Sequence, residues 1–185
     1  MAKQFPAIDE NHRSFIARQR IFFTASATDA SRVNVSPRST DAFRVLGSNR
    51  VVYLDRTGSG NETAAHLSAD GRLTVMFCAF EGAPLILRLY GRGRAVRRDS
   101  PEYQALLTAE FSGHEPMGAR QMIHLDIELV QTSCGFGVPL FAYQAERPAL
   151  DRWTEAKGDQ IEAYRREKNR VSIDGLPTGL FAEEG

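Results

Sequence analysis

The segment that most constrains the fold is the run from Arg72 to Phe80, which is apolar on both faces of an extended chain. In a strand, successive side chains point to opposite faces. One face would hold Leu73, Val75, Phe77 and Ala79, and the other Met76, Cys78 and Phe80. A strand of this kind must be covered on both sides. It is typical of a barrel strand whose outer face meets a helix or a second subunit.

The rest of the chain predicts further strands separated by turns and single helices, without the regular strand–helix alternation of a parallel sheet. Extended segments are expected at 21–26, 32–35, 42–46, 50–54, 85–96 and 121–133. Pro37 should end the second of them, because proline lacks an N–H donor. The pattern predicts a mainly β (α+β) protein with peripheral helices around an antiparallel barrel of six to seven strands.

Helices are expected over residues 9–19, 61–67, 100–111 and 150–169. Asp9 is a suitable N-cap for the first, and Pro101 suits the first position of the third. Trp153 in the last helix either packs in the core or stacks on a ligand from a partner subunit. The tail 171–185 shows no clear element. We therefore expect one domain over residues 1–185.

Composition and absent motifs exclude several classes of protein. The formal net charge is +0, so no global field favours nucleic acid or an anionic membrane as a partner. Cys78 and Cys134 are far apart, the histidines lack metal-ligand spacing, and no GxGxxG, GxxxxGK[ST], HExxH or GxSxG is present. The N-terminus lacks the apolar core of a signal peptide, and no segment reaches the roughly 20 apolar residues of a membrane span. We expect a cytoplasmic protein without a metal.

A donor-rich loop follows the expected strand at 50–54. Side-chain donors come from Thr57, Ser59, Asn61 and Thr63, backbone N–H groups from Gly58 and Gly60, and a cation from Arg56. The helix that starts at Asn61 adds unpaired N–H groups and the positive end of its dipole. This collection suits a phosphate or another compact anion. It also fits an ordinary glycine-rich loop with a helix cap.

Four segments, in this order, resemble the pyridoxamine 5′-phosphate oxidase-like flavin-binding split barrels: SRVNVSPR, RVVYLDRTGSGNETAAHL, RLTVMFCAFEGAPLILRLYGRGRAV and CGFGVPLF. The likeness covers residues 15–153. It looks closest to an uncharacterised bacterial branch of that family, not to the vitamin-processing oxidase. The resemblance implies a split β-barrel and a homodimer that binds FMN at the subunit interface.

The resemblance also implies which residues contact the cofactor. The implied positions are Asn34, Val35, Ser36, Arg38, Tyr53, Leu54, Arg56, Thr57, Ser59, Asn61 and Thr63. Residues 34–36 would lie along the flavin, residues 53–54 beside its ring, and residues 56–63 around its phosphate and ribityl chain. The oxidase has an Arg-Lys pair where this chain has Asn61-Glu62. The phosphate charge would therefore fall to Arg56, Arg38 or an arginine between residues 88 and 94.

The function that this resemblance implies is an FMN-dependent oxidoreductase acting on a small-molecule substrate, with the cofactor supplying the redox chemistry. No residue is marked as a general acid or base, so a flavin carrier or sensor without turnover is the alternative. The wider family also allows a deazaflavin or haem. The stretch Cys134-Gly135-Phe136-Gly137 is expected either to turn the chain at the end of the barrel or to approach the partner's flavin.

Overall fold

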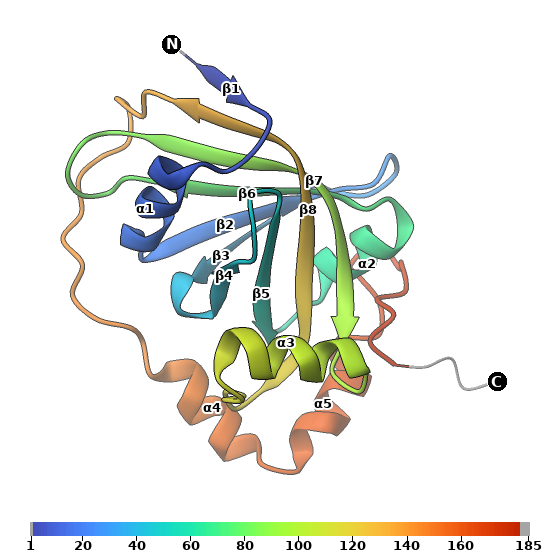
Figure 1. Cartoon of the computed structure of the whole chain (residues 1–185). Helices are drawn as coiled ribbons and strands as arrows, with labels where there is room; N and C mark the ends of the chain where they lie inside the picture. The colour runs from blue at the N-terminus through green and yellow to red at the C-terminus, as the bar shows by residue number, and fades with distance from the viewer. Residues whose placement is uncertain (1, 182–185) are drawn as a thin grey trace.

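One curved antiparallel sheet forms the body of the protein. The computed structural model describes residues 2–181. The strand order is β3-β2-β6-β7-β8-β5-β4, and the short β1 pairs with β8. The sheet curls into an open barrel with helices at its ends (Figure 1). This architecture confirms the predicted mainly β split barrel with peripheral helices.

The strands are β1 (Lys3–Phe5), β2 (Ile21–Ser26), β3 (Asn34–Ser39), β4 (Phe43–Val45), β5 (Arg50–Arg56), β6 (Arg72–Cys78), β7 (Ile86–Arg97) and β8 (Ala119–Ser133). The helices are α1 (Glu10–Arg18), α2 (Glu62–Ala69), α3 (Pro101–Phe111), α4 (Ala149–Lys157) and α5 (Gln160–Lys168). A short 3-10 helix, η1 (Thr40–Ala42), connects β3 to β4. Strands β3 and β4 are the two edges at which the barrel is split.

Two of the predicted helix starts are confirmed by their caps. The Asp9 carboxylate accepts a hydrogen bond from the His12 backbone N–H at 2.8 Å and begins α1. The Ser100 hydroxyl, directly before Pro101, accepts a hydrogen bond from the Tyr103 backbone N–H at 3.2 Å and begins α3. These short-range signals fix helix ends because each satisfies an N–H group that the helix itself leaves unpaired.

Pro37 does not end β3, contrary to the prediction. Strand β3 pairs with β2 along its whole length, with Pro37 opposite Phe23. Within the described residues, no strand pairs with the other side of β3. Proline is tolerated on such an edge, because its missing donor can point to the free side.

The prediction of one continuous helix over 150–169 is wrong, because this part of the chain forms two helices. Gly158 lies between α4 and α5 with φ +47, a conformation that other residues rarely adopt. The chain turns there, and the half-buried Trp153 packs edge-on against Tyr164 of α5, with ring centroids 5.1 Å apart. Beyond α5, as far as residue 181, only an isolated bridge joins Val171 to Pro177. Residues 182–185 of the predicted tail lie outside the described residues.

Two hydrophobic clusters lie on opposite faces of β5. The barrel interior holds Phe22, Tyr53, Phe77, Leu89 and Leu125, while Val52, Leu54 and Met122 pack against Tyr103 and Phe111 of α3. The outer face of β6 is half-buried at Met76, in keeping with the doubly apolar sequence. No helix within residues 2–181 is long and apolar enough to cross a membrane.

Candidate functional site

Strand β3 presents the most accessible of the predicted cofactor contacts. Val35, and Val33 directly before the strand, are 61% and 72% exposed. The alternate residues Asn34, Ser36 and Arg38 point to the other face, toward β5 and α2. The edge strand therefore offers exposed apolar side chains on one face, polar side chains on the other and a free backbone edge between them.

Asn34 joins β3 to helix α2. Its side-chain amide donates to the Thr63 hydroxyl at 3.1 Å and lies 3.4 Å from the Ser26 hydroxyl. The Ser36 hydroxyl donates to the Asn34 carbonyl oxygen at 3.3 Å. Ser26 Oγ also lies 3.0 Å from Nδ1 of the buried His66. The structure thus brings together the predicted Asn34, Ser36 and Thr63.

Sequence reasoning missed Ser26 and His66 as members of this cluster. Strand alternation could have placed Ser26 on the inner face of β2, opposite Asn34. The part played by His66 depends on how α2 packs against β2, and no local pattern indicates that contact.

Two arginines share one buried carboxylate between β3 and β5. Asp55 Oδ1 lies 2.6 Å from Arg38 Nη1, and Asp55 Oδ2 accepts from Arg120 Nε at 2.7 Å. Burial alone would raise the pKa of Asp55, but Arg120 and Arg38 together hold that pKa below its ordinary value. The Arg38 guanidinium also lies 5.0 Å from the centroid of the Tyr53 ring. One carboxylate facing two guanidinium groups leaves a local surplus of positive charge.

A buried amide network extends from Asp55 to the β5–α2 loop, residues 57–61. The Gln121 amide donates to Asp55 Oδ2 at 2.8 Å and to Asn61 Oδ1 at 2.7 Å. Arg120 Nη1 donates to the Gly60 carbonyl at 2.8 Å. Asn61 is therefore part of the protein interior, although its own Nδ2 has no hydrogen-bond partner within the described residues.

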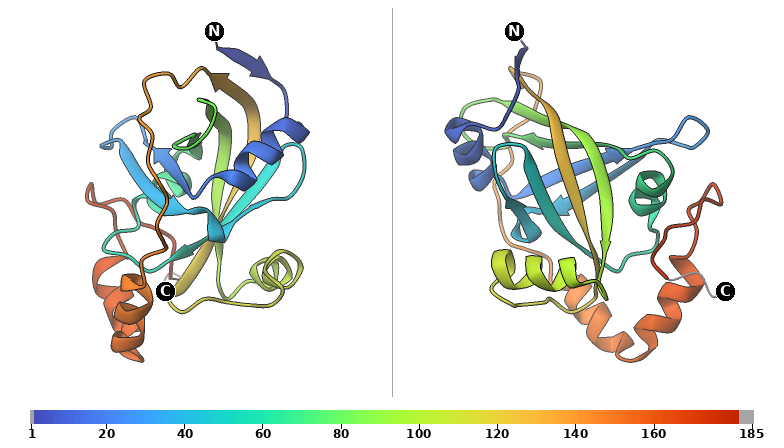
Figure 2. Two further views of the ribbon diagram at one scale, coloured as in Figure 1. Left: turned by 90° about the vertical axis from the view of Figure 1, so that its left-hand side faces the viewer. Right: turned by 45° about the vertical axis from the view of Figure 1, so that its right-hand side comes forward.

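The C-terminal segment covers the β5–α2 loop and bonds several polar groups in and beside it. Arg56 Nη2 lies 2.5 Å from the Asp151 carboxylate of α4, and Arg56 Nε donates to the Met117 carbonyl. Thr57 Oγ1 donates to the Gly118 carbonyl and accepts from Arg165 Nε of α5 at 2.8 Å. Both views in Figure 2 place the chain after α5 close to α2.

Further contacts extend this cover. The Asn169 amide donates to the Gly58 carbonyl at 3.1 Å, and the Ile173 backbone N–H donates to the Glu62 carboxylate at 3.0 Å. Arg32 pairs with Asp174. Of the predicted loop donors, Ser59 alone is an exposed residue. The predicted Leu54 faces the cluster under α3, so the structure does not bring it to this site.

The other predicted phosphate cations are engaged elsewhere. Arg94 pairs with Glu102 of α3 at 2.5 Å, and Arg92 donates to the Asp70 carbonyl at 2.7 Å. Arg88 donates to the Ser133 hydroxyl at 3.1 Å on the outer face of the sheet. Of the proposed arginines, Arg38 is the one that the structure places on β3, and its buried Nε has no hydrogen-bond partner within the described residues.

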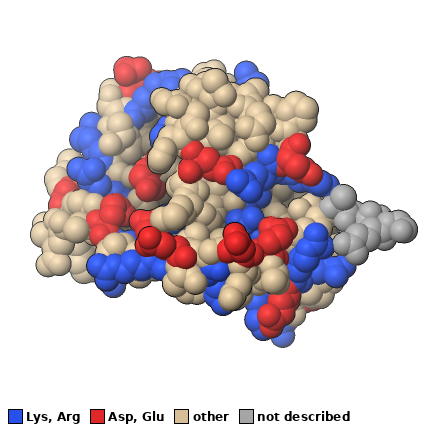
Figure 3. Space-filling model, turned by 90° about the horizontal axis from the view of Figure 1, so that it is seen from below, with Lys and Arg blue, Asp and Glu red and all other residues tan. Residues whose placement is uncertain are grey.

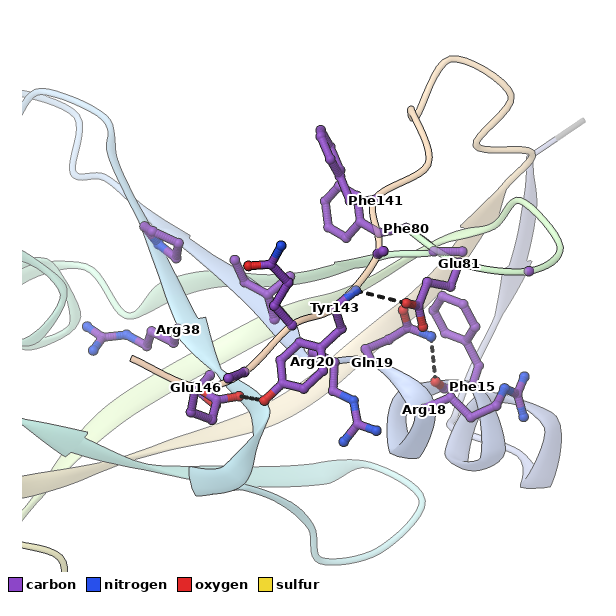
Figure 4. Close-up of a pocket in the computed structure, with 18 of the residues that line it drawn as sticks. Phe15, Arg18, Gln19, Arg20, Arg38, Phe80, Glu81, Phe141, Tyr143 and Glu146 are labelled. Carbon is purple, nitrogen blue, oxygen red and sulfur yellow. Dashed lines mark hydrogen bonds between the residues drawn. The ribbon is translucent and has the colours of Figure 1, made fainter. Parts of the chain in front are cut away.

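A cavity of about 840 Å³ lies beside β3 and beneath the extended segment 134–148 (Figure 4). Aromatic side chains and arginines line it, among them Phe80 after β6, Phe141 and Tyr143 of this segment, Arg18 at the end of α1 and Arg20 after it. The Tyr143 backbone N–H donates to Glu81 at 3.0 Å, and the Tyr143 hydroxyl donates to Glu146 at 3.0 Å. The segment is thus held over the cavity at a few points.

The segment begins with a turn at the end of the barrel. Gly135 has φ +67, and a Cβ there would lie 2.9 Å from the Leu85 backbone nitrogen. The Val138 backbone N–H donates to the Gly135 carbonyl at 2.9 Å and closes the turn. These contacts confirm the turn interpretation of Cys134–Gly137. Phe136 points away from the barrel and is 81% exposed.

Comparison with known proteins identifies relatives of the chain. Residues 8–134 match the family model described as pyridoxamine 5′-phosphate oxidase. The chain is 37% identical over 190 aligned positions to the pyridoxamine 5′-phosphate oxidase family protein ustO of Aspergillus flavus, an alignment that covers 94% of this chain and 76% of the relative.

Solved structures share the fold. HupZ from Group A Streptococcus superposes with a TM-score of 0.53 at 15% identity, covering 66% of this chain and 91% of HupZ. A point variant of HupZ gives a TM-score of 0.56 at 15% identity, covering 68% of this chain and 99% of the variant. At this identity the likeness concerns the fold alone.

Proposed function

Because the chain belongs to the pyridoxamine 5′-phosphate oxidase family, we propose that it binds FMN along β3 and acts as a homodimeric, FMN-dependent oxidoreductase on a small molecule. The observation that carries the proposal is the free edge of β3. Exposed valines lie on the outer face of this edge strand, and Arg38, which shares Asp55 with Arg120, lies on its inner face. An exposed apolar face with unpaired backbone groups along its edge suits a flat, polar-edged ring.

The residues of β3 fit the ring end of a flavin. Val33 and Val35 would pack on the ring, and the unpaired backbone groups of the strand would bind its polar edge. Arg38 would offer positive charge to an anionic group of the cofactor. When bound, a flavin supplies hydride and electron transfer, and the protein contributes orientation, hydrogen bonds and shielding from water.

The β5–α2 loop does not fit the phosphate as the loop is arranged in this structure. Arg56 is paired with Asp151, and the Thr57 hydroxyl already donates to the Gly118 carbonyl and accepts from Arg165. We therefore expect the phosphate to add little to the affinity of the protein for FMN. Riboflavin should bind nearly as tightly as FMN.

A second copy of the chain would cover apolar surface that the monomer leaves exposed. Phe136, Leu140 and Phe141 of segment 134–148 are between 60% and 81% exposed. Val33 and Val35 are further exposed apolar residues, at the edge of the sheet. Stable dimers usually bury at least roughly 1,000 Å² of such surface. A dimer measured by light scattering at micromolar concentration is the expected result, and a monomer would contradict the shared cleft.

The cofactor and the reaction are tested together on purified protein. The absorbance spectrum should show a flavin, and mass spectrometry of the released ligand should give the mass of FMN. Reduction of the bound flavin by NAD(P)H, followed by fast oxidation by an added acceptor, would support turnover. A protein that holds flavin but transfers no electrons would be a carrier or sensor. A deazaflavin or haem spectrum, or a colourless protein that takes up no FMN, would contradict the proposal.

A further inference from the structure

A second cavity, of about 750 Å³, lies between the end of β7, helix α3, helix α5 and residues 180–181. Its lining contains the arginines Arg97, Arg98, Arg120, Arg165 and Arg166. The carboxylates in the same lining are Asp99, Glu115 and Glu162. This cavity belongs to the lower part of the molecule, where basic and acidic side chains gather (Figure 3). Among the described residues of its wall, basic groups outnumber acidic groups.

Of these arginines, Arg165 is the one whose positive charge is least balanced by nearby carboxylates. Its guanidinium is buried, and two of its hydrogen bonds go to neutral oxygens, Thr57 Oγ1 and the Ala119 carbonyl, each at 2.8 Å. The carboxylate paired with it is Glu162, 3.3 Å away and itself about half exposed. Burial lowers the pKa of Arg165 despite this pair, and the nearby positive charges of Arg98 and Arg120 lower it further.

Arg120 adds a second buried guanidinium to the wall. Its Nε donates to Asp55, but Arg38 competes for that carboxylate. Arg97 and Arg98 are more exposed and pair with Asp99 and Glu115 at the rim. The cavity therefore has buried cations at its inner wall and ion-paired arginines at its mouth, where a bidentate anion could replace or join the carboxylates.

Part of the wall is apolar. Leu107 of α3 is buried, and Leu180 and Phe181 are half-buried. The Arg166 guanidinium lies 4.8 Å from the centroid of the Phe181 ring. A ligand that fills the cavity would therefore combine an oxyanion with an apolar body. Cavities of this size hold small molecules, which a few placed polar groups orient.

We propose that this cavity binds a phosphorylated small molecule, with its phosphoryl oxygens on the arginines and its body against residues 180–181. The site is separate from the proposed flavin position on β3. Arg120 and Arg165 also hold the Gly60 carbonyl and the Thr57 hydroxyl. Occupancy should therefore slow hydrogen exchange in the β5–α2 loop as well.

The test is calorimetric titration of the full-length protein with inorganic pyrophosphate, and in parallel with inorganic phosphate, at constant ionic strength. Saturable binding is expected, tighter for pyrophosphate. Arg98→Gln should weaken it at least tenfold. Glu162→Gln, which removes a competing negative charge beside Arg165, should tighten it several-fold. Arg94→Gln is the matched control, because Arg94, like Arg98, is ion-paired with a glutamate but does not line the cavity.

The unfolding midpoint of each variant verifies that it is folded, and Glu162→Gln keeps the proposal testable if Arg98→Gln is unstable. Non-saturable binding would overturn the proposal. The proposal would also be overturned if Arg98→Gln and Arg94→Gln weakened pyrophosphate binding equally, or if Glu162→Gln weakened that binding. Neither flavin content nor oxidoreductase activity enters the readout, so the result is independent of the proposed function.

Discussion

Strand β3 and the β5–α2 loop carry the same sequence-based expectation, contact with a phosphorylated flavin, but their surroundings differ. On β3, Val35 is exposed and the backbone edge is free. At the loop, Arg56 is already bonded to α4, Thr57 to α5, and the Gly58 carbonyl to Asn169 directly after α5. Donor-rich sequence indicates which groups could bind a ligand. Whether those groups are available depends on what the rest of the chain places over them.

Asp55→Asn should lower the free energy of unfolding more than any other substitution considered below. Asp55 binds Arg38 of β3 and also Arg120, which holds the β5–α2 loop. The substitution leaves Arg38 and Arg120 without their shared carboxylate inside the protein. Breaking a buried pair in this way costs about 3–5 kcal/mol. Urea unfolding measures the loss. Asp126→Asn, on the exposed side of β8, is the control and should change the free energy of unfolding little. A loss below about 1 kcal/mol for Asp55→Asn would mean that the two regions are not joined through this residue.

The same residue predicts the acid dependence of stability. The pKa of folded Asp55 lies below its ordinary value, so the unfolded chain binds the proton more readily. The stability that Asp55 contributes is therefore complete above the unfolded pKa of about 3.9 and is lost as the pH falls through the folded pKa. Unfolding curves between pH 6 and pH 3 should fall less steeply for Asp55→Asn than for the wild type. Parallel curves would contradict this assignment.

Asn169→Ala should loosen the cover of the loop. The buried Asn169 accepts from Arg120 at 2.9 Å and donates to the Gly58 carbonyl at 3.1 Å. Losing these bonds should cost about 1–3 kcal/mol. Hydrogen exchange over residues 57–61 and 170–181 should accelerate, and the preference for FMN over riboflavin should rise as the cover over the loop loosens and Arg120 loses one acceptor. Asn49→Ala removes an amide on the far side of the barrel and should leave that preference unchanged. An unchanged preference in Asn169→Ala would mean that the C-terminal cover does not keep the phosphate from the loop.

Val35→Lys should weaken flavin binding without unfolding the protein, because Val35 is exposed on an edge strand. We expect FMN and riboflavin to lose affinity alike, by about tenfold, or 1.4 kcal/mol. Fluorescence titration of both flavins gives the two dissociation constants. Leu150→Lys, another exposed aliphatic position, is the control. If both flavins bind the Val35 variant normally, β3 is not the cofactor surface.

Arg56→Ala should have the smallest effect on stability and on flavin affinity. Its partner Asp151 is more than half exposed, and such pairs contribute about 0.2–1 kcal/mol. The dissociation constants of FMN and riboflavin should both change by less than about threefold. Asp151→Asn breaks the same pair from the other side and should behave identically. If the Arg56 variant lost much affinity for FMN but not for riboflavin, the phosphate would have to bind at the loop.

Much of the fold follows from local sequence signals. Asp9, Ser100 and Gly71 mark helix ends, because caps and positive φ act within a few residues. The three-residue strand β1 has no such signal and exists through its pairing with β8. Pro37 misleads because proline is unfavourable only where both sides of a strand are paired, which sequence alone does not reveal.

The candidate site is less predictable, because its decisive contacts join distant parts of the chain. Thr57 meets Arg165, 108 positions away, and Asp55 meets Arg120, 65 positions away. The residue types at 56–63 correctly indicate donors, but the sequence does not show that α4 and α5 use them. The inward position of Arg38, by contrast, follows from strand alternation once the edge is known.

Hydrogen exchange with and without FMN compares the two regions in one experiment. Bound FMN should slow exchange over residues 32–39, where β3 has its free edge, and leave residues 57–61 unchanged. Protection confined to residues 57–61, with none on β3, would contradict the account.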